Sequence, residues 1–521
     1  MQRIVVILSC LVYFASASNI LGYFPILFNS HYLFVKPFLS KLADRGHNLT
    51  IYTAFPDKIP PSKYREIDIR HCLMKVSPAT LDEIMHPPSI LSFLDAGFFR
   101  LNPTSAQILG CAPMVELLNS TQHFDVFLTD FAQNDWYIGF AYKFKVPMIN
   151  VFPNMLFTWF AYSFGVTSHP AYIPNYLSQN PPKMNFAERV YNTYVYMVSM
   201  TVGRYYTTIP SEKVAQEVFG DIPPLDEIAR NTSITLVNTQ TPLHVSYPTP
   251  PNLIQVAGMN IGAAEKLPEN IEKFINESKH GVVYFCMGSL LRGETFPPEK
   301  REAFLYAFSK IPQRVLWKWE GDVLPGKSDN IMISKWMPQR DILAHPNVKL
   351  FISHGGLLGT SEAVYEGVPV LGIPIFGDQR TNIKSLEANG AGELLDYNEI
   401  SKEVVLEKIQ RLLNDPKYKE NAKLLSDRYR DRPMSPLDTA VYWTEYVIRH
   451  KGAPHLRTAA ADMPWYQYLL LDVIAFIVAV LVAGLLIIYY TTKFILRAIY
   501  GLICGGGAKK GSSKSDKKKR N

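Results

Sequence analysis

Short apolar segments alternate with longer helical ones through the second half of the chain. The runs GVVYFC, RVLWKW, VKLFIS and VPVLGIP have strand length, and the stretches between them carry apolar residues at helical spacing. Because parallel strands are joined by crossover helices, this alternation predicts a parallel sheet covered by helices on both faces. Residues 19–53 repeat the pattern as strand, helix and strand, which indicates a second unit of the same α/β class.

The length of the chain and one proline-rich segment indicate two folded domains. A single core rarely extends over 521 residues, and SYPTPPNL at 246–253 interrupts the pattern of strands and helices. Residues 155–208 are rich in Phe, Tyr, Trp, Met and Pro and show no strand period. This stretch is core, a pocket for apolar small molecules or a face that rests on a bilayer, and the sequence does not choose among the three.

Both ends of the chain carry the patterns of targeting segments. Arg3, an apolar run at 4–14 and the small residues at 15–17 have the order of a cleavable signal peptide, rather than of a buried strand or a membrane anchor. The uncharged stretch 473–490 is long enough to cross a bilayer, and aromatic residues flank it on both sides. The basic tail after it predicts a type I orientation with the tail in the cytosol. The final KKRN resembles a dilysine signal for retrieval to the endoplasmic reticulum, or it completes the stop-transfer charge.

Charge and cysteine content limit the partners of the chain. The net charge is +7, and the tail at 493–521 contains nine basic residues against one acidic residue, or +8. The remainder therefore carries −1, which argues against a nucleic-acid-binding surface. Between signal peptide and tail there are three cysteines, too few for a disulfide framework, and no Cys-x-x-Cys pair predicts zinc. Four sequons, which suit a lumenal domain, lie at Asn48, Asn119, Asn231 and Asn276.

Polar residues and glycines follow the apolar strands of the second half. They are Ser289, Trp336, His354, Gly355, Gly356, Gly359, Asp378 and Gln379. Ligands of open parallel sheets bind beyond the carboxyl ends of the strands, and glycines before a helix let an anion approach its free N–H groups. No Walker lysine, no G-x-G-x-x-G and no D-x-D occurs here. The pattern therefore predicts a metal-free nucleotide site, with Trp336 facing a base, His354 donating to phosphate and Glu362 within reach of ribose hydroxyls.

In the first half, a histidine and an acid each follow a predicted strand. His31 lies in the turn after the first strand, and Asp130 ends a predicted strand at 123–130. A neutral histidine near a helix N-terminus can accept a proton from a hydroxyl, and an acid would orient its ring. The alternative is a loop histidine with a satisfied hydrogen bond. Asp125, interpreted as a strand anchor, and Asp135 lie close to Asp130, and His47 is interpreted as a turn residue.

Three motifs, WMPQ (336–339), HGGLLGTSE (354–362) and FGDQ (376–379), resemble the signature of the UDP-glycosyltransferases. The resemblance covers the whole chain and is strongest to the membrane-bound animal enzymes, especially their insect branch. It implies an α/β protein of the GT-B fold, with two Rossmann-like domains facing across a cleft, plus one C-terminal transmembrane helix. The implied divisions are a signal peptide (1–17), an acceptor-binding domain (18–245), a linker (246–275), a UDP-sugar-binding domain (276–435), a returning helix and membrane approach (436–464), a transmembrane helix (465–492) and a basic tail (493–521).

The resemblance also assigns roles on the donor side. Trp336 would stack on uracil, and Gln339 would lie near the nucleoside. Glu362 would bind ribose, and Asp378 and Gln379 would bind the sugar. The diphosphate would be met by Ser289, His354, Gly359 and Thr360. Leu358 stands where many relatives have asparagine, which removes a phosphate contact or transfers it to backbone groups and Thr360. Lys318 stands where vertebrate relatives often have arginine. No metal or other cofactor is expected.

The function implied is inverting transfer of a hexose, with glucose favoured, from a UDP-sugar to a hydroxyl of a small lipophilic acceptor. His31 would act as general base with Asp130 as its partner. The expected place is the endoplasmic reticulum membrane, with lumenal catalytic domains and a cytosolic tail. Two alternatives stay open, a catalytically inactive relative that binds a lipophilic ligand or serves as a partner subunit, and a type I surface receptor. The donor sugar, glucose or glucuronate, the acceptor and self-association are not determined by the sequence.

Overall fold

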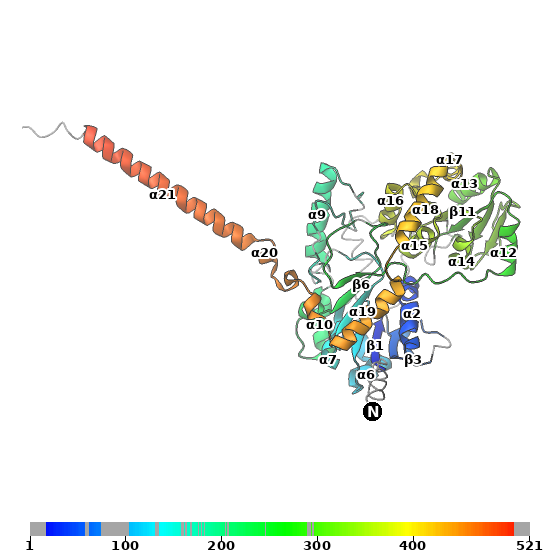
Figure 1. Cartoon of the computed structure of the whole chain (residues 1–521), viewed down its shortest axis with the longest axis horizontal. Helices are drawn as coiled ribbons and strands as arrows, with labels where there is room; N and C mark the ends of the chain where they lie inside the picture. Colours follow the sequence, from blue (N-terminus) through cyan, green and yellow to red (C-terminus); the bar gives the residue numbers. More distant parts are fainter. Residues whose placement is uncertain are drawn as a thin grey trace, which may run out of the picture. The chain divides into compact units, whose positions relative to one another are not determined.

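The computed structural model in Figure 1 describes most of the chain. The described residues are 17–57, 62–73, 104–130, 135–157, 161, 164–166, 169–175, 177–178, 180–181, 183–203, 205, 208–244, 246–288, 293 and 296–504. Residues up to Ala461 form one compact unit, and those from Asp462 form a second. The predicted signal peptide lies outside the described residues except for Ala17, and so does the tail beyond Cys504.

The first domain is built on a parallel sheet of seven strands in the order β3-β2-β1-β4-β5-β6-β7. The strands are β1 (Asn19–Phe24), β2 (Asn48–Thr53), β3 (Tyr64–Asp68), β4 (Val126–Thr129), β5 (Met148–Phe152), β6 (Ile234–Val237) and β7 (Leu253–Gln255). The helices are α2 (Asn29–Asp44), α5 (Ser105–Leu109), α6 (Ala112–Asn119), α7 (Gly139–Phe144), α9 (Phe186–Gly203), α10 (Ile209–Phe219) and α11 (Leu225–Arg230). Successive strand residues such as Ile20 and Leu21 belong to different apolar clusters, because their side chains point to opposite faces of the sheet.

The second domain repeats this architecture with six parallel strands in the order β10-β9-β8-β11-β12-β13. The strands are β8 (Val282–Cys286), β9 (Arg314–Lys318), β10 (Ile331–Ser334), β11 (Val348–Ser353), β12 (Val370–Gly372) and β13 (Gly392–Leu394). The helices are α12 (Glu269–Asn276), α13 (Pro298–Ser309), α14 (Gln339–Ala344), α15 (Leu357–Glu366), α16 (Gln379–Ala388), α17 (Lys402–Asn414) and α18 (Pro416–Arg430). The predicted α/β class with two Rossmann-like sheets is confirmed.

The segment predicted as a linker also contributes to both domains. Within 246–275, β7 pairs with β6 as the last strand of the first sheet, and most of α12 packs beneath the second sheet through Ile271 and Ile275. The crossing itself therefore occupies the shorter stretch 256–268.

Helix α19 (Pro436–His450) returns to the first domain, where it lies beside α2 (Figure 1, orange against blue). Its Glu445 accepts two hydrogen bonds from Arg45, at 2.9 and 3.0 Å, and lies 3.4 Å from Nε2 of His47. The His47 ring is buried and receives the backbone N–H of Ser18 on Nδ1. His47 lies in the turn between α2 and β2, as interpreted from the sequence, and its ring in addition joins Ser18, just before the first strand, to the returning helix.

The structure pairs Cys72 with Cys111 in a disulfide, with Cα atoms 5.5 Å apart, and leaves Cys286 buried and free. The sequence analysis proposed no disulfide, because three cysteines are too few for a disulfide framework. His71 lies beside the bonded cysteines, but both sulfur atoms are committed to the disulfide and offer no thiolate to a metal.

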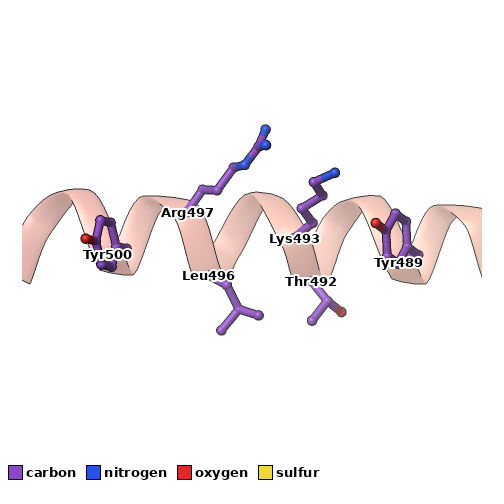
Figure 2. Close-up of a pocket in the computed structure, with 6 residues that line it drawn as sticks. All are labelled: Tyr489, Thr492, Lys493, Leu496, Arg497 and Tyr500. Atoms are coloured by element: carbon purple, nitrogen blue, oxygen red, sulfur yellow. The ribbon is translucent and has the colours of Figure 1, made fainter.

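The second unit is dominated by α21 (Leu471–Cys504), a helix of 34 residues. It is about 50 Å long at a rise of about 1.5 Å per residue. Its mean hydropathy reaches 3.0 over 18 residues, so by length and composition it can cross a membrane. A hollow on its surface is lined by Tyr489, Thr492, Lys493, Leu496, Arg497 and Tyr500 (Figure 2). All six come from this one helix, so the hollow is a space between neighbouring side chains of a single helix.

Replacing either Cys72 or Cys111 by Ser should lower the free energy of unfolding, because their bond closes a segment of 39 residues. The chain-entropy model gives an upper value of about 4 kcal/mol for a loop of this size. Thermal unfolding of the detergent-solubilised full chain measures the effect, with Cys504→Ser as the control at an exposed free cysteine. The double variant should unfold no earlier than the single ones, and midpoints equal to the wild type would contradict the pairing.

Candidate active site

His31 lies in the first turn of α2, directly after β1. The helix starts at Asn29, and the backbone N–H of His31 donates to Phe28 at 3.0 Å. The side chain of His31 is 14% exposed, so its ring is mostly shielded but open on one side.

His31 and Asp130 form a hydrogen-bonded pair. Nδ1 of His31 lies 3.0 Å from Oδ2 of Asp130, which follows the neighbouring strand β4 and is 2% exposed. Burial raises the pKa of the Asp130 carboxyl, and the contact with His31 opposes that rise. A neutral imidazole that donates Nδ1–H to the carboxylate carries its lone pair on Nε2. Nε2 is therefore the atom that can accept a proton from a hydroxyl.

The structure distinguishes Asp130 from the two acids near it in sequence. Asp125 accepts the backbone N–H of Asn19 at 2.7 Å, which anchors β1 beside β4 as interpreted from the sequence. Asp135 starts a short 3-10 helix, Asp135–Ile138, beyond the strand end. Tyr137 from that helix donates its hydroxyl to the backbone carbonyl of Asp130 at 2.8 Å and so fixes the loop that holds the acid.

Asn154 is a site residue that the sequence reasoning missed. Its Nδ2 lies 3.5 Å from Nε2 of His31, on the side of the ring opposite Asp130. Asn154 follows β5, which is the neighbour of β4, so the carboxyl ends of three adjacent strands supply the loops around His31. The signal was available, since FPNM follows an apolar strand as the other site loops do.

In the second domain, the ring of His354 fills a space between two glycine backbones. A β-carbon on Gly288 or on Gly356 would lie 2.5 Å from an atom of the His354 ring, so both positions require glycine. Burial, and secondly the charge of Lys318, lower the pKa of His354 to about 4. His354 is therefore neutral near pH 7 and can donate one N–H to an anion.

Further groups converge on the start of α15, which Gly356 caps. The hydroxyl of Thr360 is buried and has no hydrogen-bond partner among the described residues, which leaves it available to a ligand. Lys318 at the end of β9 donates to the Gly288 carbonyl at 3.1 Å and to Glu320 at 2.6 Å. Ser289 lies outside the described residues. The described part of this loop therefore places a hydroxyl, a neutral imidazole and an ammonium group beside a helix N-terminus, which suits a phosphate.

Gly359 and Leu358, both in α15, each have a role in packing. A β-carbon on Gly359 would lie 3.1 Å from Nε2 of Gln339, so Gly359 makes room for that side chain as well as for a ligand. Leu358 packs against the apolar cluster shared by the first domain and α19. Its side chain therefore serves the contact between the domains and offers nothing polar to a phosphate.

Two of the groups expected near the nucleoside are in contact. Nε2 of Gln339 donates to Oε2 of Glu362 at 2.7 Å, and burial raises the pKa of the Glu362 carboxyl. Trp336 lies just after β10, three residues before Gln339, and its side chain is 69% exposed, so it presents a free aromatic face. An exposed ring can stack on a base, and a carboxylate can hydrogen-bond ribose hydroxyls.

Asp378 is the N-cap of α16 and is half-buried, and Gln379 is the first residue of that helix and is buried. The Oε1 atom of Gln379 accepts the backbone N–H groups of Ile375 and Phe376 at 2.7 and 3.0 Å, so only its NH₂ group remains for a ligand. Burial raises the pKa of Asp378, while a hydrogen bond from Asn382 and the nearby His31 oppose that rise. The influence of His31 on the pKa of Asp378 indicates that the loops bearing these two residues face each other.

Comparisons with known proteins agree with this arrangement. The model of the family described as UDP-glucoronosyl and UDP-glucosyl transferase matches residues 90–505. The chain is 59% identical over 502 residues to UDP-glycosyltransferase UGT5 of Dactylopius coccus, with 95% of each chain covered. It is 40% identical to UDP-glucosyltransferase 2 of the same insect, with 99% of each covered, and 34% identical to UDP-glucuronosyltransferase 2B1 of Rattus norvegicus, with 90% and 91% covered.

Solved structures show the same fold at lower identity. The glycotransferase of kitacinnamycin aligns with a TM-score of 0.55 at 17% identity over 82% of this chain and 98% of its own. The structure of LpCGTa in complex with UDP aligns with a TM-score of 0.52 at 16% identity, over 83% and 100%. Together with the matching relatives, these likenesses confirm the GT-B arrangement of two Rossmann-like sheets. The chain belongs to the UDP-glucuronosyl and UDP-glucosyl transferase family of glycosyltransferases.

Proposed function

We propose that this glycosyltransferase moves a hexose, with glucose favoured, from a UDP-sugar to a hydroxyl of a small lipophilic acceptor. The observation that carries the proposal is the His31–Asp130 pair, which is joined through Nδ1 of His31 and therefore leaves Nε2 to act as the base, on a ring that influences the pKa of Asp378 in the other domain. A base next to the end of a nucleotide-sugar site is what transfer to a hydroxyl requires. The names of two insect relatives, one a UDP-glucosyltransferase, support glucose over glucuronate.

The donor would lie across the loops of the second domain. Trp336 would stack on uracil, Gln339 and Glu362 would hold the nucleoside, and His354 and Thr360 would meet the diphosphate. Gly359 would meet the same phosphate groups, and the assignment of Ser289 to them rests on the family resemblance alone. Lys318 would add a positive charge when the phosphate competes for it with Glu320. Asp378 and the NH₂ group of Gln379 would bind hydroxyls of the sugar. Helix N-terminus, neutral histidine and lysine together provide anion binding without a metal.

The acceptor oxygen would lie beside both Nε2 of His31 and Nδ2 of Asn154, which are 3.5 Å apart. The hydroxyl donates its proton to Nε2 of His31, and the amide of Asn154 donates to the same oxygen. As the oxygen bonds to the anomeric carbon from the side opposite UDP, the bond from that carbon to the phosphate oxygen breaks and UDP leaves with the electron pair. The imidazolium that forms is stabilised by Asp130, and the sugar product has inverted configuration.

We further propose that the catalytic domains lie in the lumen of the endoplasmic reticulum, with the chain anchored by α21. The Cys72–Cys111 disulfide supports an oxidising compartment. The asparagines of all four sequons, Asn48, Asn119, Asn231 and Asn276, are exposed, as glycan attachment requires.

The deciding experiment is glycoside formation in membranes that contain the full chain, offered UDP-glucose or UDP-glucuronate with a panel of phenols and steroids. His31→Ala should reduce the rate roughly 100- to 10,000-fold, the range for loss of a general base. UDP binding should persist in this variant, because His31 lies outside the donor loops. The matched control is His123→Ala, whose ring is 80% exposed in the same domain and should leave the rate unchanged.

Product formation that survives His31→Ala would contradict the role of the dyad. A wild-type chain that binds UDP but forms no product with any pair would favour an inactive relative that binds a lipophilic ligand or serves as a partner subunit.

Trp336→Ala should weaken UDP binding roughly 5- to 150-fold, because stacking of one base on an aromatic ring contributes about 1–3 kcal/mol. The unfolding midpoint should not change, since the ring is 69% exposed. Isothermal titration of UDP measures the first quantity, and Trp465→Ala, 63% exposed in the second unit, is the control. Unchanged affinity in Trp336→Ala would place the base elsewhere.

The stability of the ligand-free protein should fall as the pH drops from 6.5 towards 4. The unfolded chain protonates His354 near its ordinary pKa of 6.5, whereas the folded chain resists protonation until about 4. Unfolding therefore takes up a proton in this window, and the free energy of unfolding loses up to about 1.4 kcal/mol per pH unit from this residue. His354→Gln should show a shallower loss, while His123→Gln should follow the wild type. Parallel curves for wild type and His354→Gln would contradict the lowered pKa.

A further inference from the structure

Helix α9 carries an apolar face that is exposed to solvent. We define the α9 outer face as Phe186, Val190, Tyr191, Tyr194 and Met197, whose exposed fractions run from 44% to 74%. These residues recur at intervals of three and four, and so form one stripe along the helix. From Val190 to Gly203 the helix contains no charged residue. A helix face in contact with water ordinarily carries charged and polar side chains, so this face is built for another environment.

The opposite face of α9 fixes the rotation of the helix. Asn192, Val195 and Ser199 are fully buried. The Oδ1 atom of Asn192 accepts the backbone N–H of Asn175 at 2.7 Å, and its Nδ2 atom donates to the carbonyls of Pro170 and Ile173 at 2.7 and 2.9 Å. Because these buried hydrogen bonds would be lost if the helix turned, the α9 outer face cannot be withdrawn into the core.

The chain leaves the catalytic unit for the apolar helix from the neighbourhood of α9. A β-carbon on Gly165 would lie 2.8 Å from the Thr458 methyl group and 3.3 Å from the backbone nitrogen of Ala461, so the end of the unit lies against Gly165. Residues on either side of Gly165, Phe164 and Val166, are buried in the same apolar cluster that receives Met200 and Val202 from the end of α9.

Chain length then limits how far this face can be from a bilayer. α21 begins ten residues after Ala461, and part of that segment is the short helix α20, Trp465–Tyr468. Ten extended residues span at most about 35 Å, and helical ones less. Ala461 is therefore tethered within that distance of the membrane that α21 can cross. Gly165, which lies against Ala461, is flanked by residues of the cluster that receives the end of α9.

We infer that the α9 outer face docks into the interfacial layer of the bilayer that α21 anchors. Tyrosine and phenylalanine are the side chains that favour this layer, with apolar rings inward and hydroxyl groups at the headgroups. Arg189 lies over the Phe186 ring at 5.9 Å and can extend its guanidinium to lipid phosphates. Self-association of two copies could also bury this face, but it would not require the tether to the membrane helix at Ala461. The test must therefore distinguish contact with lipid from contact with a second copy. The inference is independent of the proposed reaction.

The test uses the full chain in lipid nanodiscs, in a Cys504→Ser background, since Cys286 is buried and Cys72 and Cys111 are bonded to each other. Tyr194→Cys carries an environment-sensitive fluorophore, and Glu302→Cys on α13 is the matched exposed control. Nitroxides attached to lipids near the headgroup should quench the label at 194 by roughly half or more, because an interfacial helix lies about 5–10 Å into the headgroup boundary. They should leave the label at 302 almost unchanged, and nitroxides near the acyl chain ends should quench the label at 194 less.

Equal quenching at both positions, or none at either, would overturn the inference. A further outcome is that lipid nitroxides leave the label at 194 unquenched while two labelled chains in one nanodisc quench each other. That result would overturn the inference and assign the face to a second copy. A further variant guards against a labelling artefact. Tyr194→Lys in the same background, with the fluorophore at Met197→Cys, should reduce lipid quenching at 197 several-fold while UDP affinity is unchanged, since α9 holds none of the donor loops.

Discussion

The candidate site depends on one constraint of parallel sheets, which is that all strands of a sheet release their polar loop residues at the same edge. In the first sheet, His31, Asp130 and Asn154 follow three adjacent strands, and in the second sheet His354 and Asp378 follow two more. The strands themselves are buried on both faces and so contain almost nothing that can react. Chemistry is therefore possible only where each strand ends, and the domains meet at those ends.

Burial then decides what each polar group can do. The same desolvation that raises the pKa of Asp130, Glu362 and Asp378 lowers that of His354, because in each case the charged form is disfavoured. The neutral ring of His354 is consequently able to donate a hydrogen bond to an anion. His31 differs because a buried acid lies on its Nδ1 atom and can stabilise the cation that proton transfer creates. Two histidines in similar turns are thus suited to different tasks.

The return of the chain to its first domain links this site to the membrane. Glu445 on α19 bonds Arg45 and contacts His47, so the segment that leads to α21 is held on the first domain rather than on the second. Leu358, at the start of α15, packs on the cluster formed there. The first domain, α19 and the start of α15 therefore share one apolar contact region, and the exposed face of α9 belongs to the same first domain.

The sequence by itself determined the α/β class, the family and the strand-end residues of the second domain, because strand and helix periods and the long motifs are local patterns. It also proposed the partner of His31, although Asp125 and Asp135 stood equally close in sequence. Tertiary structure decided among those acids, since only the pairing of β1 with β4 brings residues 99 positions apart to 3.0 Å. It also supplied Asn154, the burial of His47 against Glu445, the Cys72–Cys111 bond and the contact of Leu358. None of these leaves a local pattern, because each depends on which strands and helices become neighbours, and that is set by the packing of the whole chain.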